Sequence, residues 1–326
     1  MIRSLIAGAL FGLTAFAASA HAEVNVLTSI KPLQLIAAAV QEGVDTPDVL
    51  LPPGASPHNY ALRPSDIRRI REAQLFYWVG PDMEVFLKDV LPGRDKPSVA
   101  IQELPDLHLR RFVNFSAEAD HEHEHEHEHE HEHEHEHDHG HDEAFEHDHD
   151  HRPGSIDAHL WLSLNNARVI AARMAADLSA QDSANADRYK ANLAAFNQRL
   201  DRLDGQLKQD LTPLIGKPYF VFHEAFDYLE EAYGLSHRGV FAISGDVQPG
   251  ARHVAAMRAM LKSAGPTCVF TEPPLRPRLA DTLSQGLPVT LSELDPLGAD
   301  APVNASGYEA LLTNLTGKLT DCLGKI

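Results

Sequence analysis

The architecture of this 326-residue chain is decided by one stretch, Tyr189-Lys-Ala-Asn-Leu193-Ala-Ala-Phe196-Asn-Gln-Arg-Leu200-Asp-Arg-Leu203-Asp-Gly-Gln-Leu207-Lys-Gln-Asp-Leu211. Its apolar residues recur every three or four positions, which is the spacing of one face of an α-helix. The helical pattern begins earlier, at Asn166, and the quoted stretch lacks glycine until Gly205 and ends before Pro213. A helix of about 25 residues would be about 38 Å long. We predict that it joins two lobes as a rigid strut.

Short apolar segments alternate with helical patterns on both sides of this stretch. Before it we expect strands at 24–30, 47–52, 75–80 and 98–104 and helices at 33–41 and 66–73. After it we expect strands at 219–222, 240–243, 268–272 and 289–291 and helices at 225–232, 251–264 and 279–286. Repeated β-α units form parallel sheets covered by helices. The predicted fold class is therefore α/β, with two β-α lobes, parallel-sheet cores and a ligand cleft between them.

The net charge of −19 comes mainly from one window. Between Asp120 and Asp150 there are 15 acidic residues and no lysine or arginine. Removing those 15 carboxylates from the total of −19 leaves about −4, so the rest of the chain is close to balanced. No basic patch indicates binding to nucleic acid.

The first 22 residues have the composition of a secretory signal. Arg3 is followed by a mostly apolar run from Leu5 to Phe16, and then by small residues around Ala20 and Ala22, where cleavage is expected. The apolar run is too short to span a bilayer comfortably, which argues against an N-terminal anchor. No cysteine follows the cleavage site, which argues against a lipid anchor. We predict signal peptide 1–22, N-terminal lobe 23–165, connecting helical segment 166–212 and C-terminal lobe 213–326, in a periplasmic protein.

The chain contains two cysteines, Cys268 and Cys322. In a secreted protein such a pair favours a disulfide, and the alternative is two buried thiols. Neither has a partner at metal-ligand spacing, so we do not expect sulfur in a metal site.

Three histidines stand at element boundaries, where β-α folds present ligand groups. His58 lies in a proline-rich turn after a predicted strand, His159 precedes the long helical segment, and His223 follows a predicted strand. Three neutral imidazoles and one oxygen form a four-coordinate set suited to Zn²⁺. Spacing alone does not show that the three converge, and each could be a structural histidine.

The surrounding motifs resemble a known family. Gly54-Ala-Ser-Pro-His58-Asn-Tyr-Ala-Leu-Arg-Pro-Ser-Asp66, Asp157-Ala-His159-Leu-Trp-Leu-Ser, Phe222-His223-Glu-Ala-Phe-Asp-Tyr-Leu and Glu293-Leu-Asp295-Pro-Leu-Gly298 are similar to the zinc-specific, ZnuA-like periplasmic receptors of ABC importers. The resemblance extends over nearly all of the mature chain. It implies two lobes bridged by a rigid helix, and metal ligands at His58, His159 and His223.

The resemblance leaves the fourth ligand open. Related receptors have a carboxylate at the position of Asp295, whereas in some zinc members a water or a loop residue takes that place. Pro57 stands where some members have an acidic residue. We expect Asp295 to be the fourth ligand, with water as the alternative. Asp295 could instead be a turn residue ahead of Pro296.

His223 is expected to determine the choice of metal. Manganese-type relatives have a carboxylate at the matching position, and an imidazole there favours Zn²⁺ over Mn²⁺. Affinity order alone would also admit Cu²⁺ or Ni²⁺.

The most conspicuous repeat is a strict His-Glu alternation from His121 to His137, which continues more loosely to His151. Residues 120–151 contain almost nothing apolar, so we expect a disordered loop. The repeat matches H-E-x-x-H in several registers, but a metalloprotease needs that motif on a helix with a fixed third ligand. We predict a weak auxiliary zinc collector, with simple solvated disorder as the alternative. Its histidines are His121, His123, His125, His127, His129, His131, His133, His135, His137, His139, His141, His147, His149 and His151.

The predicted function is capture of Zn²⁺ in the periplasm and delivery to the permease and ATPase of an ABC importer. We expect a monomeric, non-enzymatic protein with no membrane anchor and no nucleic-acid partner. Two other functions compete with this one. A zinc buffer or chaperone would need no transporter. A zinc hydrolase could use three histidines with an open fourth position, although only Glu224 offers itself as a general base.

Overall fold

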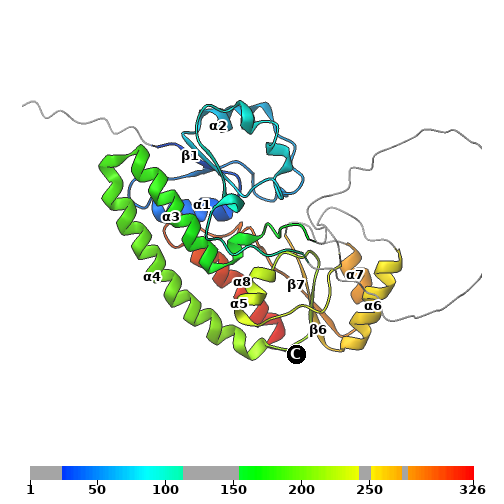
Figure 1. Cartoon of the computed structure of the whole chain (residues 1–326). Coiled ribbons are helices and arrows are strands. Elements are labelled where there is room, and N and C mark those ends of the chain that lie inside the picture. Colours follow the sequence, from blue (N-terminus) through cyan, green and yellow to red (C-terminus); the bar gives the residue numbers. More distant parts are fainter. Residues whose placement is uncertain (1–23, 113–153, 242–250, 274–277) are drawn as a thin grey trace, which may run out of the picture.

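The computed structural model describes residues 24–112, 154–241, 251–273 and 278–326 (Figure 1). The predicted signal peptide and the predicted His/Glu-rich loop, with its 14 histidines, lie outside the described residues. Within the described ranges, every helix is too short or too polar to span a bilayer.

The N-terminal lobe is built on a parallel sheet with strand order β2-β1-β3-β4. Its strands are β1 (Val26–Thr28), β2 (Asp48–Val49), β3 (Leu75–Trp78) and β4 (Ser98–Ala100), and its helices are α1 (Lys31–Val40) and α2 (Pro64–Glu72). Three short 3₁₀ helices follow the later strands, η1 (Val85–Leu87), η2 (Leu91–Gly93) and η3 (Ile101–Glu103). All six predicted elements of this lobe are present. The strand predicted at 47–52 is reduced to the two residues of β2, and the flanking Pro47 and Pro52 cannot donate ladder hydrogen bonds.

The C-terminal lobe has a second parallel sheet, in the order β5-β6-β7. Its strands are β5 (Tyr219–Val221), β6 (Thr267–Thr271) and β7 (Val289–Glu293), and its helices are α5 (Asp227–Tyr233), α6 (Ala251–Ala264), α7 (Arg278–Ser284) and α8 (Gly307–Leu323). The strand predicted at 240–243 is reduced to one parallel bridge between Val221 and Val240, and residues 242–243 are not described. Helix α8 was not predicted from the sequence.

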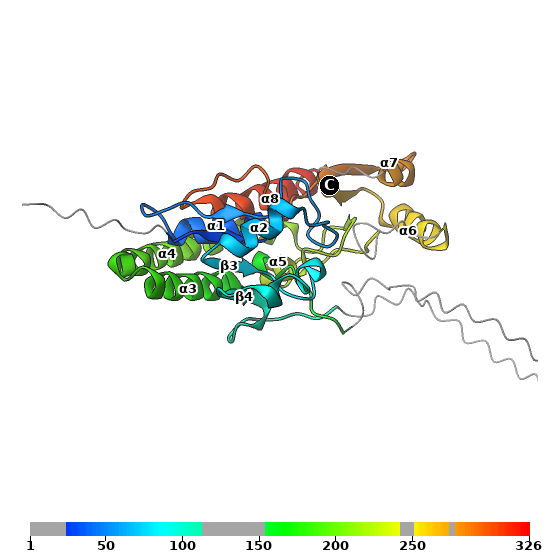
Figure 2. The same ribbon diagram turned by 90° about the horizontal axis from the view of Figure 1, so that it is seen from above.

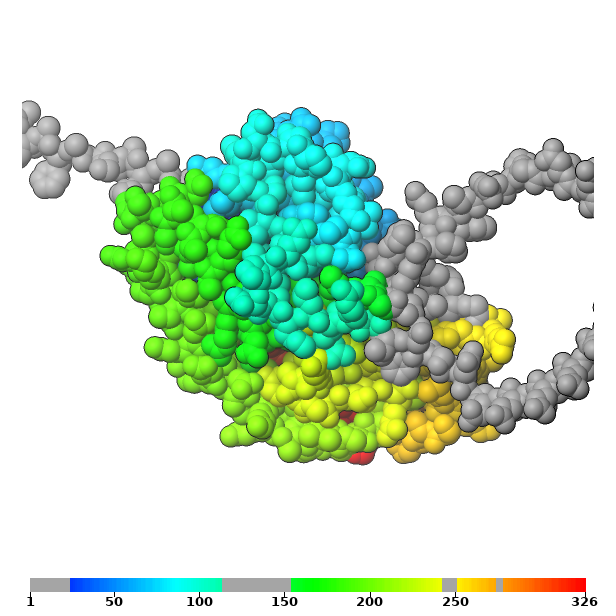
Figure 3. Space-filling model, viewed as in Figure 1, coloured from blue at the N-terminus to red at the C-terminus, as the bar shows by residue number. Residues whose placement is uncertain are grey.

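The connecting segment consists of two helices, α3 (Leu164–Gln181) and α4 (Ala186–Leu211). The 3₁₀ turn η5 (Ser183–Asn185) separates them, and η6 (Thr212–Leu214) ends α4. Helix α4, with 26 residues, runs along one side of both lobes (Figures 1 and 3). The view from above shows α1 between the α3–α4 pair and α8 (Figure 2).

The apolar face of α4 is buried as the sequence predicts. Its buried residues include Phe196, Leu200, Leu203 and Leu207. One continuous hydrophobic cluster includes side chains from both sheets, α1, α3, α4 and α8. The lobes therefore share a core, which resists large hinge motions between them.

The predicted disulfide between Cys268 and Cys322 is present, with a Cα–Cα distance of 6.2 Å. Cys268 lies on β6 and Cys322 on α8, so the bond fixes the C-terminal helix to the second sheet.

Glu84 is a fully buried carboxyl group in the N-terminal lobe, and its Oε2 accepts a hydrogen bond from the Gly80 N–H at 3.1 Å. Burial raises its pKa from 4.5 to about 7. At pH values between about 4.5 and 7, Glu84 is therefore protonated in the folded protein but ionised in the unfolded chain. As a consequence, the free energy of unfolding falls as the pH rises from about 4.5 to 7.

We expect Glu84→Gln, which does not ionise, to remove this loss. From pH 5 to pH 8 the variant should gain about 2.5 kcal/mol of unfolding free energy relative to the unsubstituted protein. Urea unfolding at both pH values measures this difference, with the exposed Glu103→Gln as the matched control. Parallel pH profiles for the protein and the Glu84 variant would contradict the prediction.

Candidate metal centre

His58, His159 and His223 converge in a cavity of about 360 Å³ that also touches Asp295 and Glu272. One ring nitrogen from each histidine lies within 4.8 Å of those of the other two. The ring centroids are 5.4 Å apart for His58 and His159, 5.2 Å for His58 and His223, and 4.9 Å for His159 and His223. Three residues that are far apart in the sequence thus present imidazoles to one point.

Each histidine is placed by the end of a secondary-structure element. His58 lies in the loop between β2 and α2, where Gly54 has a φ of 77°, a value that favours glycine. His159 is the N-cap residue of the 3₁₀ helix η4 (Leu160–Leu162). His223 follows the buried strand β5. His58 is half-buried, while His159 and His223 are 2% and 4% exposed.

The backbone around His159 is fixed to the C-terminal lobe by neighbouring aromatic residues. The indole of Trp161 donates to the carbonyl of Pro296 at 2.8 Å, and the hydroxyl of Tyr308 donates to the carbonyl of Trp161 at 2.6 Å. Both aromatic side chains are fully buried. His159 is therefore held on a rigid support.

Two of the histidines each have a different carboxylate at their Nδ1 atom. His159 Nδ1 lies 2.8 Å from Asp157 Oδ1, and His223 Nδ1 lies 2.9 Å from Glu272 Oε1. In each case Nε2 is the ring nitrogen on the side away from the carboxylate.

The electrostatic environments of these groups differ. Burial, reinforced by His223 and His58, holds the pKa of His159 well below its ordinary value, so this imidazole is neutral and able to bind metal. Burial also lowers the pKa of His223, but the Glu272 carboxylate outweighs it and the net pKa is raised. Burial raises the pKa of Asp157 to about 7.

Asp295 lines the same cavity. Its Oδ1 accepts hydrogen bonds from the backbone N–H groups of Leu297 and Gly298 at 2.9 and 3.0 Å, and its Oδ2 accepts one from Ala299 at 2.6 Å. The carboxylate therefore supports the turn that follows it, and its role as a fourth ligand stays a prediction.

The two supporting carboxylates were not predicted from the sequence, although Asp157 is only two residues from His159. A second group was not predicted either: Asp227, Glu230 and His237, whose potential ligand atoms lie within 4.8 Å of one another. In that group both carboxylate oxygens of Glu230 have a partner. Oε1 accepts a hydrogen bond from the Tyr219 hydroxyl at 2.7 Å, and Oε2 lies 2.9 Å from His237 Nδ1. This arrangement is that of a buried structural ion pair.

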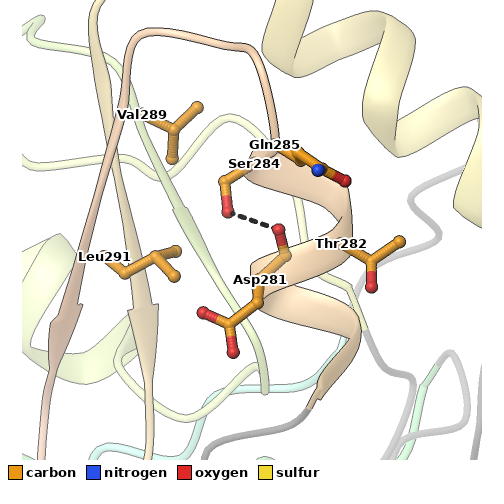
Figure 4. A pocket seen from close by; sticks show the side chains of 6 residues that line it. All are labelled: Asp281, Thr282, Ser284, Gln285, Val289 and Leu291. Atoms are coloured by element: carbon orange, nitrogen blue, oxygen red, sulfur yellow. Dashed lines mark hydrogen bonds between the residues drawn. The ribbon is translucent and has the colours of Figure 1, made fainter.

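A second cavity, of about 680 Å³, lies between α7 and β7 (Figure 4). It is lined by Asp281, Thr282, Ser284, Gln285, Val289 and Leu291, and the Ser284 hydroxyl donates to the Asp281 carbonyl at 3.4 Å. These lining residues include one carboxylate and no histidine, so they lack the donor set of a zinc site.

Comparison with known proteins identifies the family. The model of the ZnuA family, described as the periplasmic component A of the zinc-uptake complex, matches residues 26–322. The chain belongs to this family. A ZnuA of Brucella suis is 41% identical over 308 residues, with 92% of each chain covered, and one of Yersinia pestis is 36% identical over 303 residues, with 93% of this chain and 92% of its own covered.

The fold of the ZnuA family also agrees. A crystal structure of a zinc-bound ZnuA deletion mutant superposes with a TM-score of 0.70 at 22% identity, covering 92% of this chain and 98% of that one. At this identity the likeness concerns the fold alone. It confirms the predicted α/β class with two parallel-sheet cores and a long helix.

Proposed function

We propose that this chain captures Zn²⁺ in the periplasm through His58, His159 and His223 and delivers it to an ABC importer. The observation that carries the proposal is the convergence of three imidazoles in one cavity between the lobes. Asp295 or a water supplies the fourth donor.

The chemistry of this donor set favours zinc. Zn²⁺ binds imidazole nitrogen at about 2.0–2.1 Å in a tetrahedral arrangement. The harder Mn²⁺ prefers oxygen ligands, so a nitrogen at His223 selects against it. Both curated relatives described above carry the name high-affinity zinc uptake system protein, which supports the same cargo.

The partners follow from the family. A periplasmic component of a zinc-uptake complex needs a membrane permease and an ATPase to move the ion inward. In this proposal the signal peptide 1–22 directs export, and a monomer without catalytic activity presents the loaded cleft to the permease.

A competition titration against a chelator of known affinity tests the proposal. We expect one tight Zn²⁺ per chain, and zinc transport in vesicles that contain the permease and ATPase. Tight binding without any transport would favour a buffer or chaperone. Turnover of ester, peptide or lactam substrates by the zinc-loaded protein would favour a hydrolase.

The His/Glu-rich segment is proposed to collect Zn²⁺ weakly at several positions. We expect deletion of residues 120–151 to leave the tight site unchanged and to remove the additional weak sites. Calorimetric titration with Zn²⁺ measures the number of tight sites and the number of weak sites. Unchanged stoichiometry after the deletion would rule out a collecting role.

The weak sites should also weaken as the pH falls, because only neutral imidazole binds metal and the neighbouring carboxylates favour imidazolium.

A further inference from the structure

We infer that Asp157 and Glu272 are positioning residues that fix His159 and His223 with Nε2 towards the cation and strengthen both rings as donors. This inference rests on the proposed zinc site and adds to it two residues that do not touch the ion. It starts from the two contacts between carboxylate and Nδ1, at 2.8 and 2.9 Å.

The Asp157–His159 pair is rigid. Asp157 Oδ1 also accepts the backbone N–H of His159 at 3.0 Å, so one oxygen orients both the ring and the main chain. The backbone of Asp157 is held as well, because its N–H donates to the Arg110 carbonyl at 3.0 Å and its carbonyl accepts the Tyr228 hydroxyl at 2.8 Å. Asp157 is 1% exposed, which leaves little solvent to compete for the imidazole.

Strand register places Glu272 beside His223. In the parallel pair β5–β6, Val221 is aligned with Phe270, and the Phe222 N–H donates to the Phe270 carbonyl at 2.8 Å. Continuing both strands by two residues brings His223 opposite Glu272, at the carboxyl edge of the sheet. The sheet itself thus holds the carboxylate against the ring.

The two carboxyl groups also act on the donor strength of the ligands. Each lies one hydrogen bond from the Nδ1 atom of an imidazole, at 2.8 and 2.9 Å. An acceptor in this place fixes the orientation of the ring and makes it a stronger donor to the cation.

Variants of Glu272 separate position from charge. Glu272→Gln keeps an acceptor for Nδ1–H and removes the charge, whereas Glu272→Ala removes both. We expect zinc affinity to fall about tenfold in the first and about a hundredfold in the second. Asp157→Asn should resemble Glu272→Gln. The control is Glu293→Gln, which should leave the zinc affinity unchanged. Glu293 is an exposed carboxylate on β7, aligned with Thr271 on the neighbouring strand.

Imidazole NMR of the zinc-loaded proteins gives a readout that a loss of stability would not produce. We expect the Nδ1–H proton of His223 to be visible and protected from exchange in the unsubstituted protein and in Glu272→Gln, but not in Glu272→Ala.

Two outcomes would overturn the inference: wild-type zinc affinity in Glu272→Ala, or a protected His223 Nδ1–H in that variant. If the unsubstituted protein bound no Zn²⁺ tightly, both the inference and the proposed function would fail. If His223→Ala weakened binding while Glu272→Ala did not, only the positioning role would fail.

Discussion

Replacing His223 by alanine should lower zinc affinity by roughly a hundredfold to a thousandfold. Four-ligand zinc sites bind with about 10–16 kcal/mol, so one ligand contributes about 2.5–4 kcal/mol on average. His223 is 4% exposed within the cavity, and an alanine side chain has no donor atom to replace its Nε2. The affinity is measured by chelator competition.

The matched control for this variant is His108→Ala. The side chain of His108 is 57% exposed and contacts Glu231, so its loss removes an imidazole without altering the cavity. A second variant, His223→Asp, exchanges nitrogen for oxygen and should narrow the preference for Zn²⁺ over Mn²⁺. Near-native zinc affinity in His223→Ala would remove this residue from the site.

Replacing both cysteines by alanine should lower the free energy of unfolding by about 4 kcal/mol. The disulfide spans 54 positions, and on the chain-entropy model a loop of that size restricts the unfolded chain by about this amount. Both cysteines are buried, at 0% and 3% exposure, so truncation also removes some packing. Denaturant unfolding of the metal-free protein measures the difference.

Reduction provides the control for the cysteine variant. A thiol reductant should bring the unsubstituted protein close to the stability of Cys268→Ala/Cys322→Ala and should not affect the variant. Zinc affinity should be the same in both proteins under conditions where both are folded, because neither cysteine lines the cavity. A variant as stable as the oxidised protein would contradict the prediction.

Much of the fold could be predicted because local patterns and tertiary packing agree. The apolar face of α4 follows helical spacing without interruption, and that face is buried along its length. Helix α8 was missed because Thr313, Thr316, Gly317 and Thr320 have low helix propensity. Burial of Leu312, Leu315 and Leu319 against the shared core overrides that propensity.

The convergence of the three histidines could be predicted, but the residues that support them could not. Residue type and position made His58, His159 and His223 candidates, and the family resemblance made them specific. Glu272 carries no local signal, because its contact with His223 depends on the register of two strands 49 residues apart. The conspicuous His-Glu repeat contributes none of the three converging imidazoles.

Diffraction at the zinc absorption edge from crystals of the zinc-loaded protein locates the bound ion. We expect one strong anomalous peak among His58, His159 and His223, with three nitrogen ligands at about 2.0–2.1 Å. A principal peak elsewhere, such as beside Asp227, Glu230 and His237, or a peak that lacks any of the three histidines as a ligand, would contradict it.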